Sequence, residues 1–398
     1  MTTEPLGELN VPHRLLLGPG PSGVHPRVYR AMQQPVIGYL DPAFIQLMDD
    51  TQRPLRTIFR TENDLTMPIS GTGTAGMEAA VYNIVEPGDN VVVCMNGFFG
   101  TRLAEMARRC GATVFPVEAE WGRIIEPEQV SETLQKAGRT KAVMIVHGET
   151  STGILQPLED VSRITHEAGA LLVVDAVTSL SGCELLIDEW GIDICYAGTQ
   201  KCLSAPPGMA PLTVSQAAMD VIQSRTVPVA SFYVDLTILG RYWAEGSTTR
   251  MYHHTPPMTM LYALREGLRI VMEEGLEARI ARHKRNANAL IAGVTAMGMT
   301  LHAQPEYRLP PLTTVGVPDG VDERQLRMAL LQNHNIEVGG GIGDLAGQIL
   351  RIGLMGFNST AQNVLGLLFA LEIELLALAV RLDKGAGVAA VVKYYDEN

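Results

Sequence analysis

Short apolar segments alternate with helix-like segments between residues 65 and 214, and this alternation limits the possible folds more than any other feature of the chain. The apolar segments are almost continuously hydrophobic, as strands are when both faces of a parallel sheet are covered. Their alternation with helical segments favours an α/β fold, in which helices wrap a mostly parallel sheet. The predicted strands are residues 65–69, 91–95, 113–117, 142–147, 171–177, 194–197 and 210–214. The predicted helices between them include residues 75–85, 101–110 and 162–168.

The length of the chain and a change of pattern near residue 256 predict two domains. A chain of 398 residues is longer than one hydrophobic core usually supports. Two long helical patterns follow Pro256 and Pro257, and a mixture of strand-like and helix-like segments completes the chain. We therefore expect a large domain over residues 20–256 and a small C-terminal α+β domain over residues 257–398, with residues 1–19 packed against the small domain.

Composition and charge favour small-molecule chemistry in a cytoplasmic protein. A net charge of −12 and a pI near 5.3 offer no basic surface to nucleic acid or to anionic lipid. No secretory signal is visible at the amino terminus, and the apolar residues 364–380 carry Glu372 and Glu374, as a packed helix does and a membrane span does not. The five cysteines lack Cys-x-x-Cys spacing, which indicates reduced core thiols.

An amine and a carboxylate follow two neighbouring predicted strands. Asp175 ends the apolar run 171–175, and Lys201 ends the segment 193–201. Side chains at the carboxyl ends of strands in an α/β sheet face a common crevice. This placement suits pyridoxal phosphate, because Lys201 would hold the aldehyde carbon as a Schiff base while Asp175 would keep the pyridine nitrogen protonated. Partial burial would lower the pKa of Lys201 and make its amine a usable proton carrier.

A glycine-rich loop between a predicted strand and a predicted helix indicates a phosphate site. Residues 69–76 (ISGTGTAG) satisfy the Gly-x-Gly-x-x-Gly pattern of dinucleotide-binding folds. Those folds also need an acidic residue at the end of the next strand, and here that strand ends without a carboxylate. Helix-start amides and the hydroxyls of Thr72 and Thr74 could equally bind a phosphate monoester. A glycine turn needed only for packing is the other interpretation.

Two isolated residues are candidate ligand contacts with structural alternatives. Phe99, between Gly97 and Gly100, could stack on a pyridine ring, although an aromatic residue in this position is more often part of the core. Arg351 interrupts the apolar residues 349–353, where an unpaired guanidinium is expensive to desolvate. Arg351 therefore needs an anion, which the residues alone leave open as a substrate carboxylate or a protein carboxylate.

Residues 252–255 (YHHT) contain adjacent histidines but do not predict a metal site. Neighbouring side chains of an extended segment point to opposite faces, and no cysteine or carboxylate ligand pattern accompanies the histidines. We expect no metal here. Tyr252 and Thr255 instead offer hydroxyl groups that could reach a phosphate.

Several longer motifs resemble one family of enzymes throughout the chain. The chain is similar to the class V, fold-type I aminotransferases of the alanine–glyoxylate and serine–glyoxylate group. The motifs that carry the resemblance are residues 15–22 (LLLGPGPS), 146–153 (VHGETSTG), 175–180 (DAVTSL), 198–204 (GTQKCLS), 251–255 (MYHHT), 262–267 (YALREG) and 351–356 (RIGLMG). Together they are specific, whereas each alone would be weak.

The resemblance implies a pyridoxal phosphate site and a role for each matching residue. Lys201 matches the Schiff-base lysine, Asp175 the partner of the pyridine nitrogen and Phe99 the ring-stacking aromatic. The other implied cofactor contacts are Thr72, Gly73, Thr74 and Gln200 at the phosphate, Thr150 near the ring hydroxyl, and Val177. Tyr252 and Thr255 match residues that reach the partner subunit's cofactor phosphate, which implies a homodimer. Arg351 matches the arginine that binds the substrate α-carboxylate, and Tyr39 is placed with it among the substrate contacts.

The same resemblance implies transamination of a small amino acid, alanine or serine, with glyoxylate. Because we identify one carboxylate clamp and no second basic residue in the pocket, dicarboxylate substrates are expected to be poor. A related branch acts on ureidoglycine and glyoxylate and carries amides where this chain has Tyr39 and Tyr252, so that activity is the alternative. A non-catalytic protein that binds pyridoxal phosphate is a further alternative. Cysteine desulfurases need a cysteine well after the lysine, and none follows Cys202.

Overall fold

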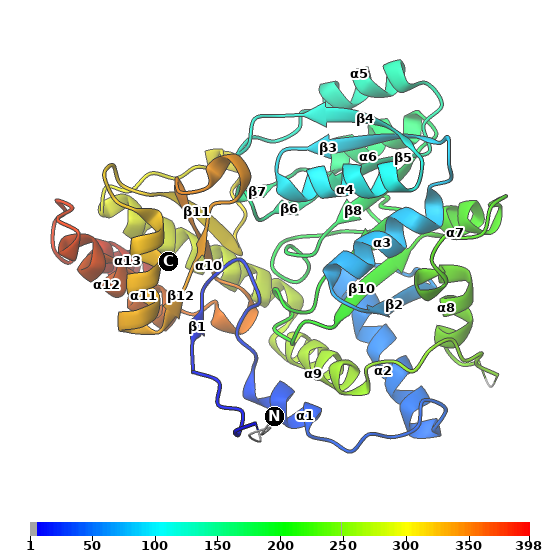
Figure 1. Ribbon diagram of the computed structural model, residues 1–398, viewed down its shortest axis with the longest axis horizontal. Helices are drawn as coiled ribbons and strands as arrows, with labels where there is room; N and C mark the ends of the chain where they lie inside the picture. The colour runs from blue at the N-terminus through cyan, green and yellow to red at the C-terminus, as the bar shows by residue number, and fades with distance from the viewer. Residues whose placement is uncertain (1–5, 248) are drawn as a thin grey trace, which may run out of the picture.

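Seven strands form the central sheet of the protein in the computed structural model, which describes residues 6–247 and 249–398 (Figure 1). In spatial order they are β2 (Leu65–Ser70), β10 (Met209–Val214), β9 (Ile194–Tyr196), β8 (Leu171–Asp175), β5 (Ala142–Val146), β3 (Asn90–Met95) and β4 (Thr113–Glu118). Neighbouring strands are parallel except at β10, which is antiparallel to both β2 and β9. The predicted α/β fold with a mostly parallel sheet is confirmed, and every predicted strand of this region is present.

Helices cover both faces of this sheet. Every side chain of β5 and of β10 is buried, as continuous apolar strands require when neither face meets water. The helices of this body are α1 (Pro26–Met32), α2 (Pro42–Phe59), α3 (Gly73–Ile84), α4 (Phe98–Arg109), α5 (Pro127–Ala137), α6 (Glu159–Glu167), α7 (Gln216–Gln223), α8 (Leu236–Trp243) and α9 (Met258–Glu274). A short hairpin of β6 (Gly148–Glu149) and β7 (Ile154–Leu155) and a 3-10 helix η1 (Phe232–Val234) complete it.

A second, smaller body holds the rest of the chain (Figure 1). Its antiparallel sheet has the order β11 (Leu312–Gly316), β14 (Ile349–Gly353) and β13 (Gly339–Gly340). Its helices are α10 (Leu276–Ala296), α11 (Glu323–His334), α12 (Ala361–Ala377) and α13 (Ala386–Glu397), with 3-10 helices η2 (Pro305–Tyr307), η3 (Gly343–Leu345) and η4 (Gly356–Asn358). No helix in the described ranges has both the length and the apolar content needed to cross a membrane.

The two bodies have separate apolar cores, and their limits differ from the predicted domain limits. Helix α9 directs its apolar side chains, from Met258 to Val271, into the core of the large sheet, although the sequence analysis assigns it to the small domain. The amino-terminal strand β1 (Leu15–Leu16) pairs with β12 (Ile336–Glu337), and Leu17 belongs to the smaller core. Residues 1–5 lie outside the described residues. We propose that the boundary falls after α9.

Two element ends differ from the sequence prediction because side chains bind the backbone there. Helix α4 begins at Phe98 instead of residue 101, since Glu149 and Ser151 accept hydrogen bonds from the amides of its first turn. Strand β8 ends at Asp175 instead of residue 177, since the carboxylate of Asp175 accepts a hydrogen bond from the Val177 amide and turns the chain away. Both changes shape the cavity described below.

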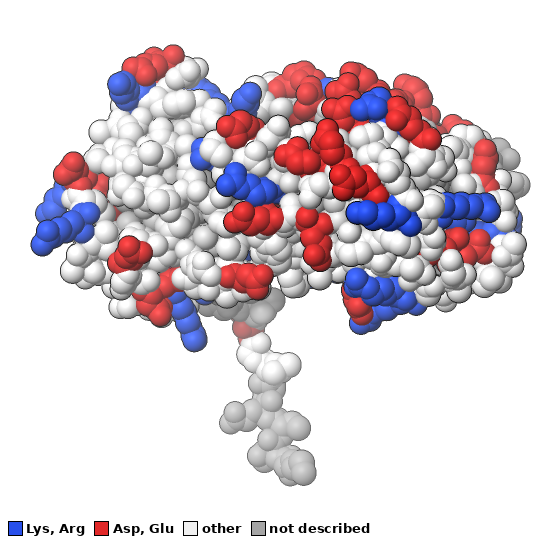
Figure 2. Space-filling model, turned by 90° about the horizontal axis from the view of Figure 1, so that it is seen from above, with Lys and Arg blue, Asp and Glu red and all other residues white. Residues whose placement is uncertain are grey.

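The surface and the thiols agree with the expectations from composition. All five cysteines are free thiols, and four of them are buried. On the face drawn in Figure 2, acidic and basic side chains are interspersed. This face therefore presents no broad field of positive charge of the kind that a nucleic acid backbone binds.

Candidate active site

One cavity at the carboxyl ends of the central strands collects most of the predicted site residues. Its predicted members are Thr72, Gly73, Thr74, Phe99, Thr150, Asp175, Val177, Gln200 and Lys201, and Met77, Arg102, Val146, Gly148 and Thr178 also line it. The residues come from five separate regions of the chain, which the strands of the central sheet bring to one edge. Tyr39, Tyr252, Thr255 and Arg351 do not line this cavity.

Asp175 is a buried carboxylate held by two hydrogen bonds. Its Oδ1 accepts from the Val177 amide at 2.9 Å, and its Oδ2 accepts from the Tyr196 hydroxyl at 2.9 Å. Asp175 and Tyr196 lie opposite each other in the parallel register of β8 and β9, so their side chains share one face of the sheet. Burial raises the pKa of Asp175 to about 6, against the lowering effect of the Val177 amide. The carboxylate therefore favours a cationic partner, such as a protonated pyridine nitrogen.

Lys201 faces the same cavity with a buried amine. Its Nζ donates a hydrogen bond to the Pro19 carbonyl, and its backbone carbonyl accepts one from the Ser22 hydroxyl at 2.7 Å. Gly20 has a φ of +110°, which favours glycine, and a Cβ there would lie 2.7 Å from the Lys201 Nζ. Burial, followed by the nearby Arg351 charge, lowers the pKa of Lys201 to about 8. An amine with this pKa can both release and accept a proton near neutral pH.

The glycine-rich loop forms the anion-binding end of the cavity. Strand β2 ends at Ser70 and helix α3 begins at Gly73, and the Thr72 side chain makes no capping hydrogen bond. The first amides of α3 therefore keep their hydrogen-bonding capacity for a ligand. Gly71 has a φ of +148°, and a Cβ on Gly73 would lie 2.9 Å from the Val177 side chain. The buried Oε1 of Gln200 has no partner among the described residues.

Phe99 is held in the cavity wall by a buried acid that the sequence analysis did not identify. Glu149, fully buried on β6, accepts hydrogen bonds from the Phe99 amide at 2.9 Å and from the Ser151 hydroxyl at 2.6 Å. Burial raises the pKa of Glu149, while these hydrogen bonds oppose that rise. Glu149 fixes the first turn of α4, and with it the place of the Phe99 ring. The motif 146–153 contained this residue, but only the fold shows what it contacts.

Arg102 also lines the cavity, although the sequence analysis identified no basic residue in the pocket to act beside the carboxylate clamp, Arg351. Its guanidinium carbon lies 4.9 Å from the centre of the Phe99 ring, and its Nη1 lies 3.4 Å from the Thr74 hydroxyl. Arg102 is therefore at the end of the cavity that holds the glycine-rich loop. As one residue of a surface helix, it gave no signal in the sequence.

Arg351 lies on β14 of the smaller body, beyond Thr150. Its Nε donates a hydrogen bond to the Gly340 carbonyl at 2.6 Å, and its Nη1 donates to the Thr150 carbonyl at 3.4 Å. No carboxylate of the described residues lies within 4.0 Å of its guanidinium. Burial lowers the pKa of Arg351, as expected for a guanidinium without an ionic partner. The sequence analysis considered a substrate carboxylate or a protein carboxylate for Arg351. Among the described residues, no protein carboxylate pairs with it.

Residues 252–255, which we call the YHHT segment, lie apart from the cavity of their own chain. Tyr252 is 47% exposed and Thr255 is also exposed, with their hydroxyl oxygens 3.4 Å apart. The Tyr252 ring packs against the Tyr39 ring at 4.5 Å between centroids. The histidines do not point to opposite faces as expected from an extended segment. The Nδ1 atoms of His253 and His254 lie 2.7 Å apart.

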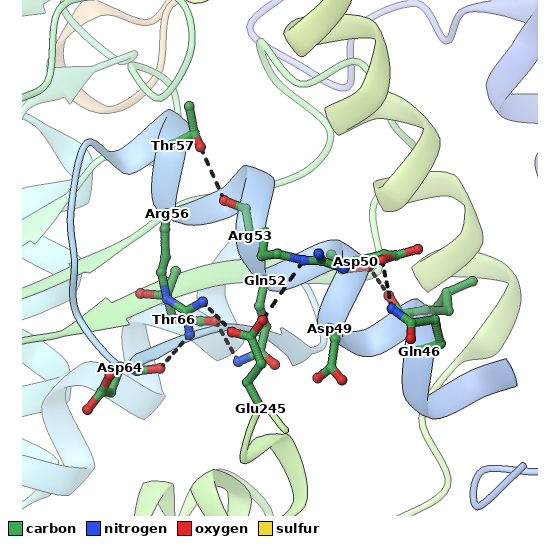
Figure 3. Close-up of polar contacts among 12 residues, drawn as sticks. Gln46, Asp49, Asp50, Gln52, Arg53, Arg56, Thr57, Asp64, Thr66 and Glu245 are labelled. Atoms are coloured by element: carbon green, nitrogen blue, oxygen red, sulfur yellow. Dashed lines mark hydrogen bonds and ion pairs between the residues drawn. The ribbon is translucent and has the colours of Figure 1, made fainter. Parts of the chain in front are cut away.

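Helix α2 anchors the chain directly before the YHHT segment. Figure 3 shows Glu245 facing Arg53 and Arg56 of α2, and both arginines form ion pairs with it. Arg250 pairs with Asp49 on the same helix, and its side chain is almost completely buried. Two points of attachment therefore fix the approach to Tyr252.

The site is typical of proteins that bind a cofactor with two features: a ring that contains a cationic nitrogen, and an anionic group. A buried carboxylate, a buried amine of lowered pKa and a helix amino terminus surround one cavity, and this set fits pyridoxal phosphate. Asp175 would hold the ring nitrogen, Lys201 the aldehyde, Phe99 one ring face, and the loop 71–74 the phosphate.

Comparison with known proteins gives the family. Residues 27–365 match the family description aminotransferase class V. The chain is 42% identical to the alanine–glyoxylate aminotransferase of Callithrix jacchus, over 90% of this chain and 87% of that protein. The protein belongs to the class V aminotransferases, and its cofactor is pyridoxal phosphate. The predicted family, enzyme class and cofactor are thereby confirmed.

Two solved structures of the same family are similar to this one over almost their whole length. The ureidoglycine–glyoxylate aminotransferase of Bacillus subtilis is 44% identical, with a TM-score of 0.95 over 98% of this chain and 100% of that chain. The alanine–glyoxylate aminotransferase of Nostoc sp. is 48% identical, with a TM-score of 0.91 over 94% of this chain and 98% of that chain. Both enzymes are named for glyoxylate, and the two names differ in the amino donor.

Proposed function

We propose that this aminotransferase moves an amino group from alanine or serine to glyoxylate, giving glycine and pyruvate or hydroxypyruvate. The observation that carries the proposal is the cavity in which Lys201 and Asp175 face one space, with Arg351 next to it and free of any described carboxylate. Arg102 lies by the glycine-rich loop, so Arg351 is the arginine available for a substrate α-carboxylate. One available clamp suits a substrate with one carboxylate.

Each residue has a defined task in the proposed reaction. The bound cofactor supplies a ring that stabilises negative charge at the substrate α-carbon. Asp175 holds a proton at the ring nitrogen, and Phe99 covers one ring face. Lys201 would take the proton from the substrate α-carbon as a general base and then return it as a general acid, since its lowered pKa permits both. The guanidinium of Arg351 orients the substrate through its carboxylate.

The amino donor is proposed from two phenol side chains. Tyr39 and Tyr252 pack together, and neither offers the amide that the sequence analysis associates with ureidoglycine. Ureidoglycine remains the second candidate, since the Bacillus subtilis enzyme named for it has a TM-score of 0.95 with this protein.

A panel of amino donors tests the choice. Purified enzyme is mixed with alanine, serine, glycine, glutamate or ureidoglycine, without a keto acid, and the absorbance of the bound cofactor is followed. We expect a fast change with alanine or serine. A change with ureidoglycine alone would select the second candidate, and a change with glutamate alone would contradict both.

We also propose a homodimer in a cytoplasmic location. The exposed hydroxyls of Tyr252 and Thr255, outside the cavity of their own chain, support a role at a partner subunit's cofactor phosphate. The five free thiols support a reducing compartment. Sedimentation of the holoenzyme tests the dimer.

A further inference from the structure

The two histidines of the YHHT segment form a hydrogen-bonded chain between two distant elements. His253 Nε2 lies 3.0 Å from the Phe232 carbonyl of η1, and His254 Nε2 lies 2.7 Å from the Ser70 hydroxyl at the end of β2. The Nδ1 atoms of the two rings, 2.7 Å apart, complete the chain. The Phe232 ring stacks on the His253 ring at 4.7 Å, and His253 is only 7% exposed.

With both rings neutral, the Phe232 carbonyl sets the direction of every hydrogen bond in this series. A carbonyl only accepts, so His253 Nε2 carries the hydrogen that Phe232 receives. In the neutral ring of His253, Nδ1 then accepts, and His254 Nδ1 must donate to it. His254 Nε2 is left as an acceptor, so the Ser70 hydroxyl donates to it. Burial lowers the pKa of His254 to about 4, which agrees with a neutral ring at physiological pH.

The position of Ser70 indicates what this series of hydrogen bonds does. Ser70 is buried and comes directly before Gly71 and Thr72, and Thr72 lines the anion-binding end of the cavity. We propose that His253 and His254 are positioning residues that lock Tyr252 and Thr255 in place by tying the YHHT segment to Ser70 and Phe232. The proposal rests on the proposed role of Tyr252 and Thr255 at the partner's cofactor phosphate. It goes beyond that role, because neither histidine needs to touch a ligand.

Two single variants remove the same hydrogen bond from its two ends. Ser70→Ala deletes only the donor hydroxyl. His254→Asn keeps an N–H at the Nδ1 position for His253 but loses the acceptor for Ser70. Ser162→Ala is the matched control, because the buried Ser162 hydroxyl lies 3.5 Å from another histidine, His166, on helix α6. All three are prepared as holoenzymes.

The first measurement is amide hydrogen exchange of residues 250–256 in the holoenzymes. We expect exchange to be at least about 3-fold faster in Ser70→Ala and in His254→Asn, and unchanged in Ser162→Ala. The double variant should exchange no faster than either single variant, because both changes break one bond. Equal exchange in the wild type and Ser70→Ala would overturn the proposed link.

The second measurement is the dissociation constant of pyridoxal phosphate, from spectrophotometric titration. Loss of one hydrogen bond predicts an increase of about 3- to 10-fold in Ser70→Ala, with none in Ser162→Ala. An unchanged constant in Ser70→Ala, in a protein where Tyr252→Phe raises it, would overturn the positioning role. An unchanged constant in Tyr252→Phe would instead contradict the proposed phosphate contact, and hydrogen exchange would then decide the histidine link alone.

Discussion

The cavity around Lys201 and the YHHT segment differ in how far their side chains are buried and hydrogen-bonded within the chain. Asp175 and Lys201 are buried and hydrogen-bonded by groups from the same chain. In the YHHT segment, the two histidines have hydrogen-bond partners, while Tyr252 and Thr255 are exposed. The Tyr252 ring packs against the rings of Tyr39 and Tyr242. The difference teaches that burial and hydrogen bonds within the chain hold Lys201 and Asp175 in place, whereas the hydroxyls of Tyr252 and Thr255 face outward.

The largest expected effect comes from removing the amine of the cavity. Lys201→Ala should reduce transamination by on the order of 10³-fold or more, because both the covalent attachment and the proton carrier are lost. Steady-state rates with alanine and glyoxylate measure this loss. Lys141→Ala is a suitable control, since Lys141 lies at the opposite end of the same sheet and pairs with Asp89 near the surface. Similar rates in the two variants would contradict the assigned role.

Acid should destabilise the core on which the cavity depends. Burial lowers the pKa of His147 and of His283 to about 3, from an ordinary value of 6.5. His283 donates from Nδ1 to the Arg279 carbonyl and accepts the Gly356 amide at Nε2, which leaves no site for a second proton. Because the unfolded chain binds these protons and the folded chain does not, the free energy of unfolding should fall as pH drops from 6.5 toward 4.

The expected loss is on the order of a few kcal/mol for each histidine. Urea unfolding followed by circular dichroism at pH 7.5, 6 and 5 measures it. A free energy of unfolding that stayed constant over this range would show that the two rings are already protonated in the fold.

A smaller effect is expected when the buried carboxylate is neutralised. Asp175→Asn should reduce kcat by about 10- to 100-fold, since a charge-assisted hydrogen bond to the ring nitrogen contributes about 1.5–3 kcal/mol. In the cofactor-free protein, by contrast, the same substitution should stabilise the fold at pH 8. The pKa of Asp175 is raised to about 6, so its ionisation destabilises the fold as pH rises through that value. At pH 8 the cofactor-free variant should therefore unfold at a higher urea concentration than the wild type, and a lower one would count against this account.

The smallest effect is expected in the YHHT segment. Tyr252→Phe removes one exposed hydroxyl and should raise the dissociation constant of pyridoxal phosphate about 3- to 10-fold, with little change in the stability of the subunit. Titration of the cofactor-free protein measures the constant, and Tyr29→Phe provides a control at another exposed tyrosine. An equal effect of both changes would remove the distinction drawn between the two regions.

Structural features with a local cause could be predicted from local patterns in the sequence. Continuous apolar runs predicted each strand of the large sheet, because a strand covered on both faces has no polar side. The glycine pattern located the loop before α3. The position of Asp175 at the end of the apolar run 171–175 identified it as a candidate site residue. The resemblance to one family added the residues of the cavity wall, such as Gln200 and Thr150.

Other features had no local signal. Tyr196 was indistinguishable from a core residue, and only the register of β9 beside β8 places its hydroxyl on Asp175. The start of α4 depends on Glu149, a residue about fifty positions away in the chain. The contact between His253 and His254 contradicted the rule for extended segments, because bonds to Phe232 and Ser70 turn the two rings toward each other.

The amino-acid sequence by itself therefore determined the class of fold, the pair Lys201 and Asp175, and the family. These follow from hydrophobic periodicity and from residue types that stand at the ends of strands. Only the tertiary structure decided that Glu149 caps α4 and that Arg102 lies beside Thr74. It also decided that Arg351 has no ionic partner among the described carboxylates, and that α9 packs on the large core. Each of these depends on contacts between residues far apart in the chain, and such contacts leave no periodic pattern to read.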